Sequence, residues 1–86
     1  MARLVILGSG ESGVGTALLG KKEGYEVFVS DFGKIDTAYK EVLIKNNIEW
    51  EESQHTEDKI LNADLVMKSP GIPDSAAIVR KLREKK

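Results

Sequence analysis

The stretch Arg3-Leu-Val-Ile-Leu-Gly-Ser-Gly-Glu-Ser-Gly13 joins a short apolar run to three closely spaced glycines. Residues 4–7 are all apolar, which favours a strand buried on both faces of a parallel sheet. The glycines follow directly as Gly8-x-Gly10-x-x-Gly13, and a helical pattern begins after them. This order is typical of sites that hold a diphosphate. The first glycine permits a tight turn, the second admits the ligand to the backbone, and the third allows close packing of helix on strand.

The composition predicts one small, ordered domain over residues 1–86. The chain has 41% hydrophobic and 31% charged side chains, no cysteine and a formal net charge of −1. We therefore expect no disulfide and no cysteine-based metal site. The near-neutral charge argues against general nucleic-acid binding, and no apolar run approaches the ~20 residues that a membrane span needs. A strand at the very N-terminus leaves no room for a secretory signal, so we expect a cytoplasmic location without membrane contact.

The rest of the chain predicts alternating strands and helices. We expect helices over residues 12–22 and 36–46, and strands over 26–30, 48–51 and 65–68. We also expect a short helix through Leu61 with Thr56 as its cap, and a last helix capped by Asp74 or Ser75. Short connections between parallel strands imply right-handed crossovers. The predicted fold is α/β: a Rossmann-like domain of three layers, whose parallel sheet has about four strands in the order 3-2-1-4.

Candidate ligand contacts gather where the predicted strands end. Asp31 follows the second strand, 18 residues after Gly13, where dinucleotide-binding folds place an acidic residue that accepts hydrogen bonds from a ribose. Capping of a turn is the alternative role for Asp31. The turn Ser69-Pro-Gly-Ile-Pro73 follows the fourth strand, and its prolines cannot continue a strand. We expect the glycine loop, Asp31 and this turn to open onto one crevice, where the strand order reverses.

Two apparent motifs are not expected to carry chemistry. Gly15-Thr-Ala-Leu-Leu-Gly20-Lys21 has the spacing of a phosphate-binding P-loop, but Lys22 replaces the magnesium-binding Ser or Thr. The run also lies inside a predicted helix, so Gly20 is assigned to close packing. His55 is the only histidine, has no carboxylates around it at metal-ligand spacing, and is assigned to a loop.

The third predicted strand carries side chains with structural interpretations. Glu49, Glu51 and Glu52 are expected to discourage pairing at the edge of the sheet. Trp50 is expected to pack against the core or the edge, with stacking on a ligand base as the alternative. We find no convincing catalytic constellation in the sequence and expect a binding module.

Taken together, Gly8-Ser-Gly-Glu-Ser-Gly13, Val29-Ser-Asp31 and Lys68-Ser-Pro-Gly-Ile-Pro73 resemble the N-terminal domain of the Mur ligase family. The resemblance covers essentially the whole chain, and its most specific part is the Ser-Pro-Gly-Ile-Pro turn. It implies a cytoplasmic, ATP-dependent amide-bond ligase of peptidoglycan synthesis that adds D-glutamate to UDP-N-acetylmuramoyl-L-alanine. The chain would then be the UDP-binding fragment of a three-domain enzyme.

The resemblance also assigns ligand contacts. The glycines of the loop and the backbone amides that follow would face the diphosphate, the end of the second strand would meet the uracil, and the proline turn would close the other wall: Gly8, Gly10, Glu11, Ser12 and Gly13; Asp31, Phe32 and Gly33; Ser69, Pro70 and Gly71. Relatives often carry Thr and Arg after the Asp, whereas Phe32-Gly33-Lys34 follows here, so Phe32 could stack on the base instead. ATP and magnesium would bind to the remaining ligase domains in cis, and this fragment alone would hold no cofactor and would not be catalytic.

Two other functions remain open at this point. The same glycines and Asp31 suit an NAD(P)-binding domain of an oxidoreductase. A non-catalytic Rossmann-like module without nucleotide affinity is the third possibility.

Overall fold

The computed structural model describes residues 2–69 and 77–85, in which strands and helices alternate. Within this part of the chain the elements are β1 Arg3–Leu7, α1 Glu11–Lys22, β2 Glu26–Asp31, α2 Thr37–Lys45, β3 Glu49–Glu52, α3 Glu57–Ile60, β4 Leu65–Lys68 and α4 Ala77–Lys85. The predicted elements are confirmed, with boundaries that move by one or two residues. The expected cap of the last helix at Asp74 or Ser75 lies outside the described residues.

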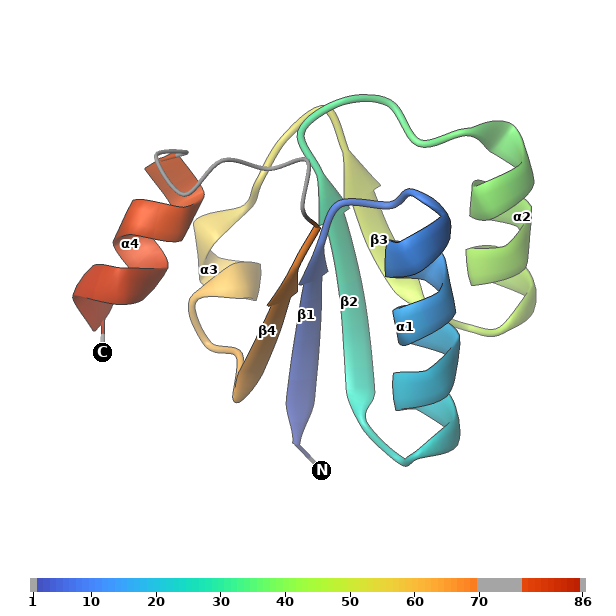
Figure 1. Cartoon of the computed structure of the whole chain (residues 1–86), viewed down its shortest axis with the longest axis horizontal. Coiled ribbons are helices and arrows are strands. Elements are labelled where there is room, and N and C mark those ends of the chain that lie inside the picture. Colours follow the sequence, from blue (N-terminus) through green and yellow to red (C-terminus); the bar gives the residue numbers. More distant parts are fainter. Residues whose placement is uncertain (1, 70–76, 86) are drawn as a thin grey trace.

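All four strands form one parallel sheet in the order β3-β2-β1-β4, as predicted. β1 pairs with β2 from Arg3 to Leu7 and with β4 from Leu4 to Leu7, so it lies inside the sheet. Helices α1 and α2 cover one face, and α3 and α4 lie on the other (Figure 1). The continuous apolar run of β1 is explained by this position, because both of its faces are covered.

Two apolar clusters hold the three layers together. Alternate residues of β1 point to opposite faces, so Leu4 and Ile6 join the cluster under α1 and α2, whereas Val5 and Leu7 join the cluster under α3 and α4. The first cluster consists of Leu4, Ile6, Ala17, Val27, Val29, Ile35, Leu43 and Ile48. The second consists of Val5, Leu7, Phe28, Ile60, Ile78 and Val79.

The helix ends follow the local sequence. Gly24, with φ of 92°, ends α1, and Asn47, with φ of 57°, ends α2; both residue types tolerate the left-handed conformation. Asp36 begins α2 by accepting a hydrogen bond of 2.9 Å from the backbone N–H of Ala38. Thr56 does not cap α3 with its side chain as predicted, because its hydroxyl donates to Glu51 instead.

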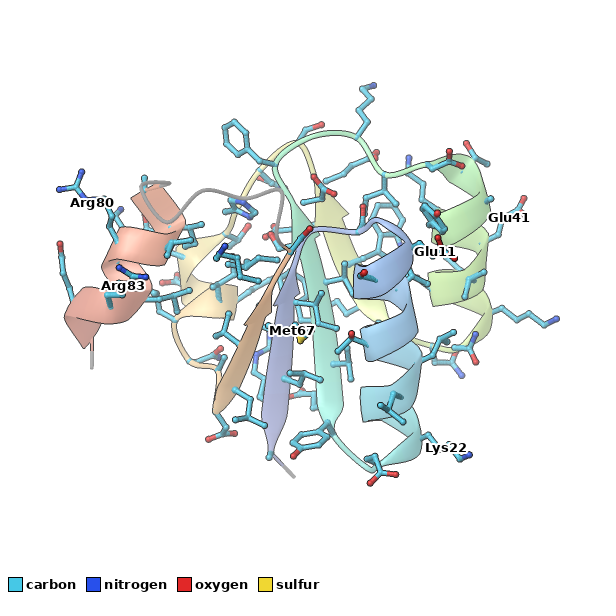
Figure 2. All side chains as sticks on the ribbon, viewed as in Figure 1. Glu11, Lys22, Glu41, Met67, Arg80 and Arg83 are labelled. Atoms are coloured by element: carbon cyan, nitrogen blue, oxygen red, sulfur yellow. The ribbon has the colours of Figure 1, made fainter. Side chains whose placement is uncertain are left out.

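The β4 edge of the sheet carries apolar side chains that the described residues leave partly open. Leu65, Val66 and Met67 are all exposed, although they belong to the parallel sheet. Val79 and Leu82 of α4 line a groove of about 450 Å³ beside this strand. Arg83 also lines this groove, whereas Arg80 extends away from the sheet (Figure 2).

Replacement by alanine should have opposite effects on stability at two glycines of α1. A Cβ at position 13 would lie 2.1 Å from the Gly8 carbonyl oxygen, whereas a Cβ at position 15 would meet nothing within 4 Å. Gly13→Ala should therefore lower the free energy of unfolding by about 1–3 kcal/mol through overpacking. Gly15→Ala should raise it by about 0.5–1 kcal/mol through helix propensity. Urea unfolding of both variants measures the difference, and equal stabilities would contradict this packing.

Candidate functional site

The first and third glycines of the loop have structural roles. Gly8 has φ of 104°, and its backbone N–H donates to the Ser30 carbonyl at 2.9 Å, which ties the end of β1 to β2. The tight contact between Gly13 and Gly8 lets α1 begin directly above the end of β1. The predicted turn and close-packing functions of these two positions are confirmed.

Gly10 differs because the fold itself does not require a glycine there. Its φ of −67° and ψ of −174° are accessible to any residue, and a Cβ would enter open space. It begins α1 without a side-chain cap. Among residues 2–69 and 77–85, the N–H groups of Glu11, Ser12 and Gly13 have no hydrogen-bond partner. Figure 2 shows Glu11 in the first turn of α1.

Asp31 connects the loop between β1 and α1 to the loop between β2 and α2. Its Oδ2 accepts from the backbone N–H of Ser9 at 2.9 Å and from the Ser9 hydroxyl at 2.6 Å. Its Oδ1 accepts from the Gly33 N–H at 2.9 Å. A carboxylate offers about four acceptor positions, so about one remains for a donor on a ligand. Burial alone would raise the pKa of Asp31, but the hydrogen bonds from Ser9 and Gly33 outweigh it and lower the pKa.

Ser69, which follows β4, lies beside the glycine loop. Its backbone N–H donates to the Leu7 carbonyl at 2.8 Å, which extends the β1–β4 pairing up to the glycine loop. The structure thus gathers Gly8 to Gly13, Asp31 to Gly33, and Ser69 at the carboxyl ends of β1, β2 and β4 (Figure 1). Pro70 and Gly71 lie outside the described residues, so their predicted contacts stay predictions.

Phe32 and His55 lie together at this edge. Phe32 follows β2 and is 72% exposed, and its ring centroid is 5.6 Å from that of His55 with a tilt of 34°. His55 occupies the loop between β3 and α3, as predicted, but it also contacts Ser30 at the end of β2. Sequence reasoning missed this contact, since 25 residues separate the two side chains.

The prediction that Glu51 guards an exposed edge is wrong. Glu51 is only 8% exposed, and its Oε2 accepts from the Ser30 hydroxyl and from the Thr56 N–H, each at 2.7 Å. The Thr56 hydroxyl donates to its Oε1. Burial would raise the pKa of Glu51, but these hydrogen bonds lower it overall. Glu51 therefore fastens the β3–α3 loop to β2.

Of the two neighbouring glutamates, Glu52 holds a loop, whereas Glu49 fits the predicted role at the sheet edge. Glu52 accepts from the Ile35 N–H at 2.9 Å and pairs with Lys40 at 2.8 Å, so it holds the loop before α2 rather than guarding the edge. Glu49 is exposed and pairs with Lys59, which agrees with the edge interpretation. Trp50 packs against the first apolar cluster, with the Lys40 ammonium 5.4 Å from its ring centroid.

Other candidate chemistry is absent from the described part of the chain. The GxxxxGK run lies inside α1, and a Cβ on Gly20 would lie 2.6 Å from Leu4, so Gly20 serves close packing, as predicted. Residues 2–69 and 77–85 contain no group of three or more His, Cys, Asp or Glu side chains that could hold a metal ion. Within the same residues, no helix has the length and hydrophobicity to cross a bilayer.

A parallel sheet of order 3-2-1-4 with a glycine turn leading into a helix without a side-chain cap is typical of the class of Rossmann-like domains. The sequence matches the family described as MurD N-terminal domain over residues 3–78. The chain therefore belongs to this family of Mur ligase domains.

Curated relatives named UDP-N-acetylmuramoylalanine--D-glutamate ligase are similar along nearly the whole chain. The protein of Christiangramia forsetii is 64% identical over 83 residues, which cover 96% of this chain and 19% of that protein. The protein of Bacteroides thetaiotaomicron is 55% identical over the same length and the same shares. The protein of Porphyromonas gingivalis strain W83 is 57% identical over 77 residues, 90% of this chain and 17% of that protein. The chain thus spans about a fifth of the length of these ligases.

The buried glutamate of β3 should matter more than its exposed neighbour. In Glu51→Gln, one carboxylate oxygen that accepts from Thr56 or Ser30 is replaced by an amide donor. We expect the free energy of unfolding to fall by about 1–3 kcal/mol. Glu49→Gln is the matched control, and its change should stay within about 0.5 kcal/mol because the Lys59 pair is exposed. Urea denaturation of both variants tests the difference.

The site should also lose stability in acid. For His55, burial lowers the pKa and outweighs the opposing effect of Glu51 and Asp31, and both carboxylates also have lowered pKa values. All three groups bind fewer protons in the folded chain than in the unfolded chain, so acid favours unfolding. The free energy of unfolding should first decline below pH 6.5, the ordinary pKa of His, and again below 4.5 and 3.8, the ordinary values for Glu and Asp. Urea titrations from pH 7.5 to 3 measure this, and a flat profile would contradict it.

Proposed function

We propose that this chain is the UDP-binding domain of a ligase that adds D-glutamate to UDP-N-acetylmuramoyl-L-alanine. Membership of the MurD N-terminal domain family supports the proposal, as does the name carried by the relatives. The observation that carries it is the start of α1, where backbone amides without a partner in the described part of the chain lie beside the open space at Gly10.

The diphosphate of the substrate would lie at this helix end. The N–H groups of Glu11 and Ser12 are available as donors, and the helix dipole favours negative charge there. Because Gly10 carries no side chain, phosphate oxygens could approach the backbone at the position a Cβ would otherwise fill. This accounts for a glycine that the fold itself does not need.

The uridine would extend from the diphosphate toward the ends of β2 and β4. Asp31 has about one acceptor position left for a ligand donor, and the exposed ring of Phe32 offers a surface for stacking. Gly33 stays beside Asp31 through its N–H. Ser69 begins the opposite wall, which Pro70 and Gly71 would complete.

ATP and magnesium belong to other parts of the polypeptide under this proposal. The described residues do not suit either group, because the GxxxxGK run lies inside α1 and residues 2–69 and 77–85 contain no group of three or more His, Cys, Asp or Glu side chains that could hold a metal ion. The relatives are about five times as long as the match. The remaining ligase domains in cis would supply the chemistry, in the cytoplasm where nucleotide substrates are made, and this chain alone would turn over nothing.

Gly10→Ala tests where the diphosphate binds. The fold should tolerate the new methyl group, but the methyl would occupy the proposed phosphate position, so the affinity for UDP should fall at least tenfold, a loss of about 1.4 kcal/mol. Gly15→Ala on the same helix is the control and should leave the affinity unchanged. Isothermal titration with UDP measures both variants. Equal UDP affinity in Gly10→Ala and the unmodified chain would contradict the proposed site.

A competing ligand tests the nucleotide class. Titration of the unmodified chain with NAD should give weaker binding than with UDP. UDP at 100 times its Kd should raise the free energy of unfolding by about 2.7 kcal/mol. A preference for NAD would favour an oxidoreductase domain, and no stabilisation by either nucleotide would favour a module without nucleotide affinity.

A further inference from the structure

The buried hydroxyl of Ser30 lies among three polar atoms at the edge of the candidate site. Ser30 is fully buried. Its Oγ lies 2.7 Å from Glu51 Oε2, 3.2 Å from the Gln54 carbonyl oxygen and 2.7 Å from His55 Nδ1. A serine hydroxyl has one proton to donate and two lone pairs that accept. Glu51 and the Gln54 carbonyl can only accept, since the lowered pKa of Glu51 keeps it ionised at neutral pH.

This arrangement determines the tautomer of His55. If the Ser30 proton pointed at His55, the serine oxygen and Glu51 Oε2 would face each other at 2.7 Å without a proton between them. The proton must therefore point toward Glu51, and His55 Nδ1 must donate to the serine oxygen. A neutral imidazole has only one N–H, so Nε2 carries a lone pair and accepts.

Nε2 is open to a ligand. Among the described residues nothing hydrogen-bonds to it, yet no buried side-chain polar atom lacks a partner, so Nε2 must reach solvent. The charged groups facing the ring are Glu51 and Asp31. Burial outweighs both and lowers the pKa of His55, so the ring is neutral and Nε2 is an acceptor at pH 7.

The neighbours of His55 suggest which ligand group it would contact. The ring of Phe32 lies beside it and is largely exposed to solvent, which suits stacking on a heterocycle. Uracil has a ring N–H at N3, whereas the corresponding nitrogen of cytosine carries a lone pair. A lone pair on Nε2 would attract the first and repel the second.

We propose that His55 is a specificity-determining residue that accepts a hydrogen bond from a uracil ring N–H while Phe32 stacks on the base. This inference rests on the proposed function, because it assumes that the diphosphate is held at the start of α1. It adds a contact from the β3–α3 loop, which the glycine loop, Asp31 and the proline turn do not include. Ser30 and Glu51 act as positioning residues, since they hold the imidazole through Nδ1.

The His55→Asn variant distinguishes the role of Nδ1 from that of Nε2. The amide nitrogen of Asn can donate to Ser30 much as Nδ1 does, but Asn has no atom at the position of Nε2. The affinities of the unmodified chain and the variant are measured for UDP, CDP and inorganic pyrophosphate. We expect UDP affinity to fall about three- to tenfold, the effect of one hydrogen bond, with pyrophosphate affinity unchanged. The preference for UDP over CDP should largely disappear.

A second measurement does not depend on the variant. The ¹⁵N chemical shifts of the imidazole in the unmodified chain should identify Nδ1 as protonated and Nε2 as unprotonated at pH 7.5, and UDP should shift the Nε2 signal. A protonated Nε2 in the free chain would overturn the inference.

The outcomes distinguish this inference from the proposed function. If His55→Asn binds UDP as tightly as the unmodified chain does and pyrophosphate still binds, His55 does not contact the base and the proposed function stands. If the unmodified chain binds neither UDP nor pyrophosphate, the proposed function fails and this inference fails with it.

Discussion

The close approach of α1 to the end of β1 is the constraint on which the rest of the site depends. The Gly8 carbonyl oxygen occupies the space that a Cβ of residue 13 would need. The helix can therefore begin directly above the strand. The N–H groups of its first turn, which have no partner among residues 2–69 and 77–85, lie where β1, β2 and β4 end. The positive end of the helix dipole is thereby placed at the point where the strand order reverses, which is where open parallel sheets bind ligands.

Acidic side chains hold the loops around this helix end. Asp31, Glu51 and Glu52 each accept from a backbone N–H of a loop: Ser9 and Gly33, Thr56, and Ile35. A loop without secondary structure needs such partners for its backbone N–H groups. These hydrogen bonds hold the loops in position, and they are strongest when the carboxylates are ionised. This links the acid sensitivity of the domain to the geometry of its candidate site.

The prediction that the glutamates of the third strand discourage pairing at the edge of the sheet failed for Glu51 and Glu52. The alternation in residues 48–51 correctly indicated a strand, but Glu51 lies under the β3–α3 loop rather than on an open surface. Helix α3 has only four residues, too few for a periodic pattern to show which side it covers. The assignment of His55 to a loop was correct, but its contact with Ser30 depends on how that loop folds back over β2. The burial of Glu51 depends on hydrogen bonds from Ser30 and Thr56, and no periodic pattern in the sequence indicates such contacts.

The sequence by itself determined the order of the elements, the parallel sheet, the roles of Gly8 and Gly13, and the family. These features follow from patterns among near neighbours in the chain: a buried apolar strand, glycines at fixed spacing, and residues that begin or end helices. Only the tertiary structure decided which donors surround Asp31 and Glu51, that Gly10 faces open space, and that His55 offers one nitrogen to solvent. The physical reason is that hydrogen-bond partners for buried polar groups come from whichever segments folding brings within about 3 Å, and here Ser9 and Asp31 are 22 positions apart in the chain.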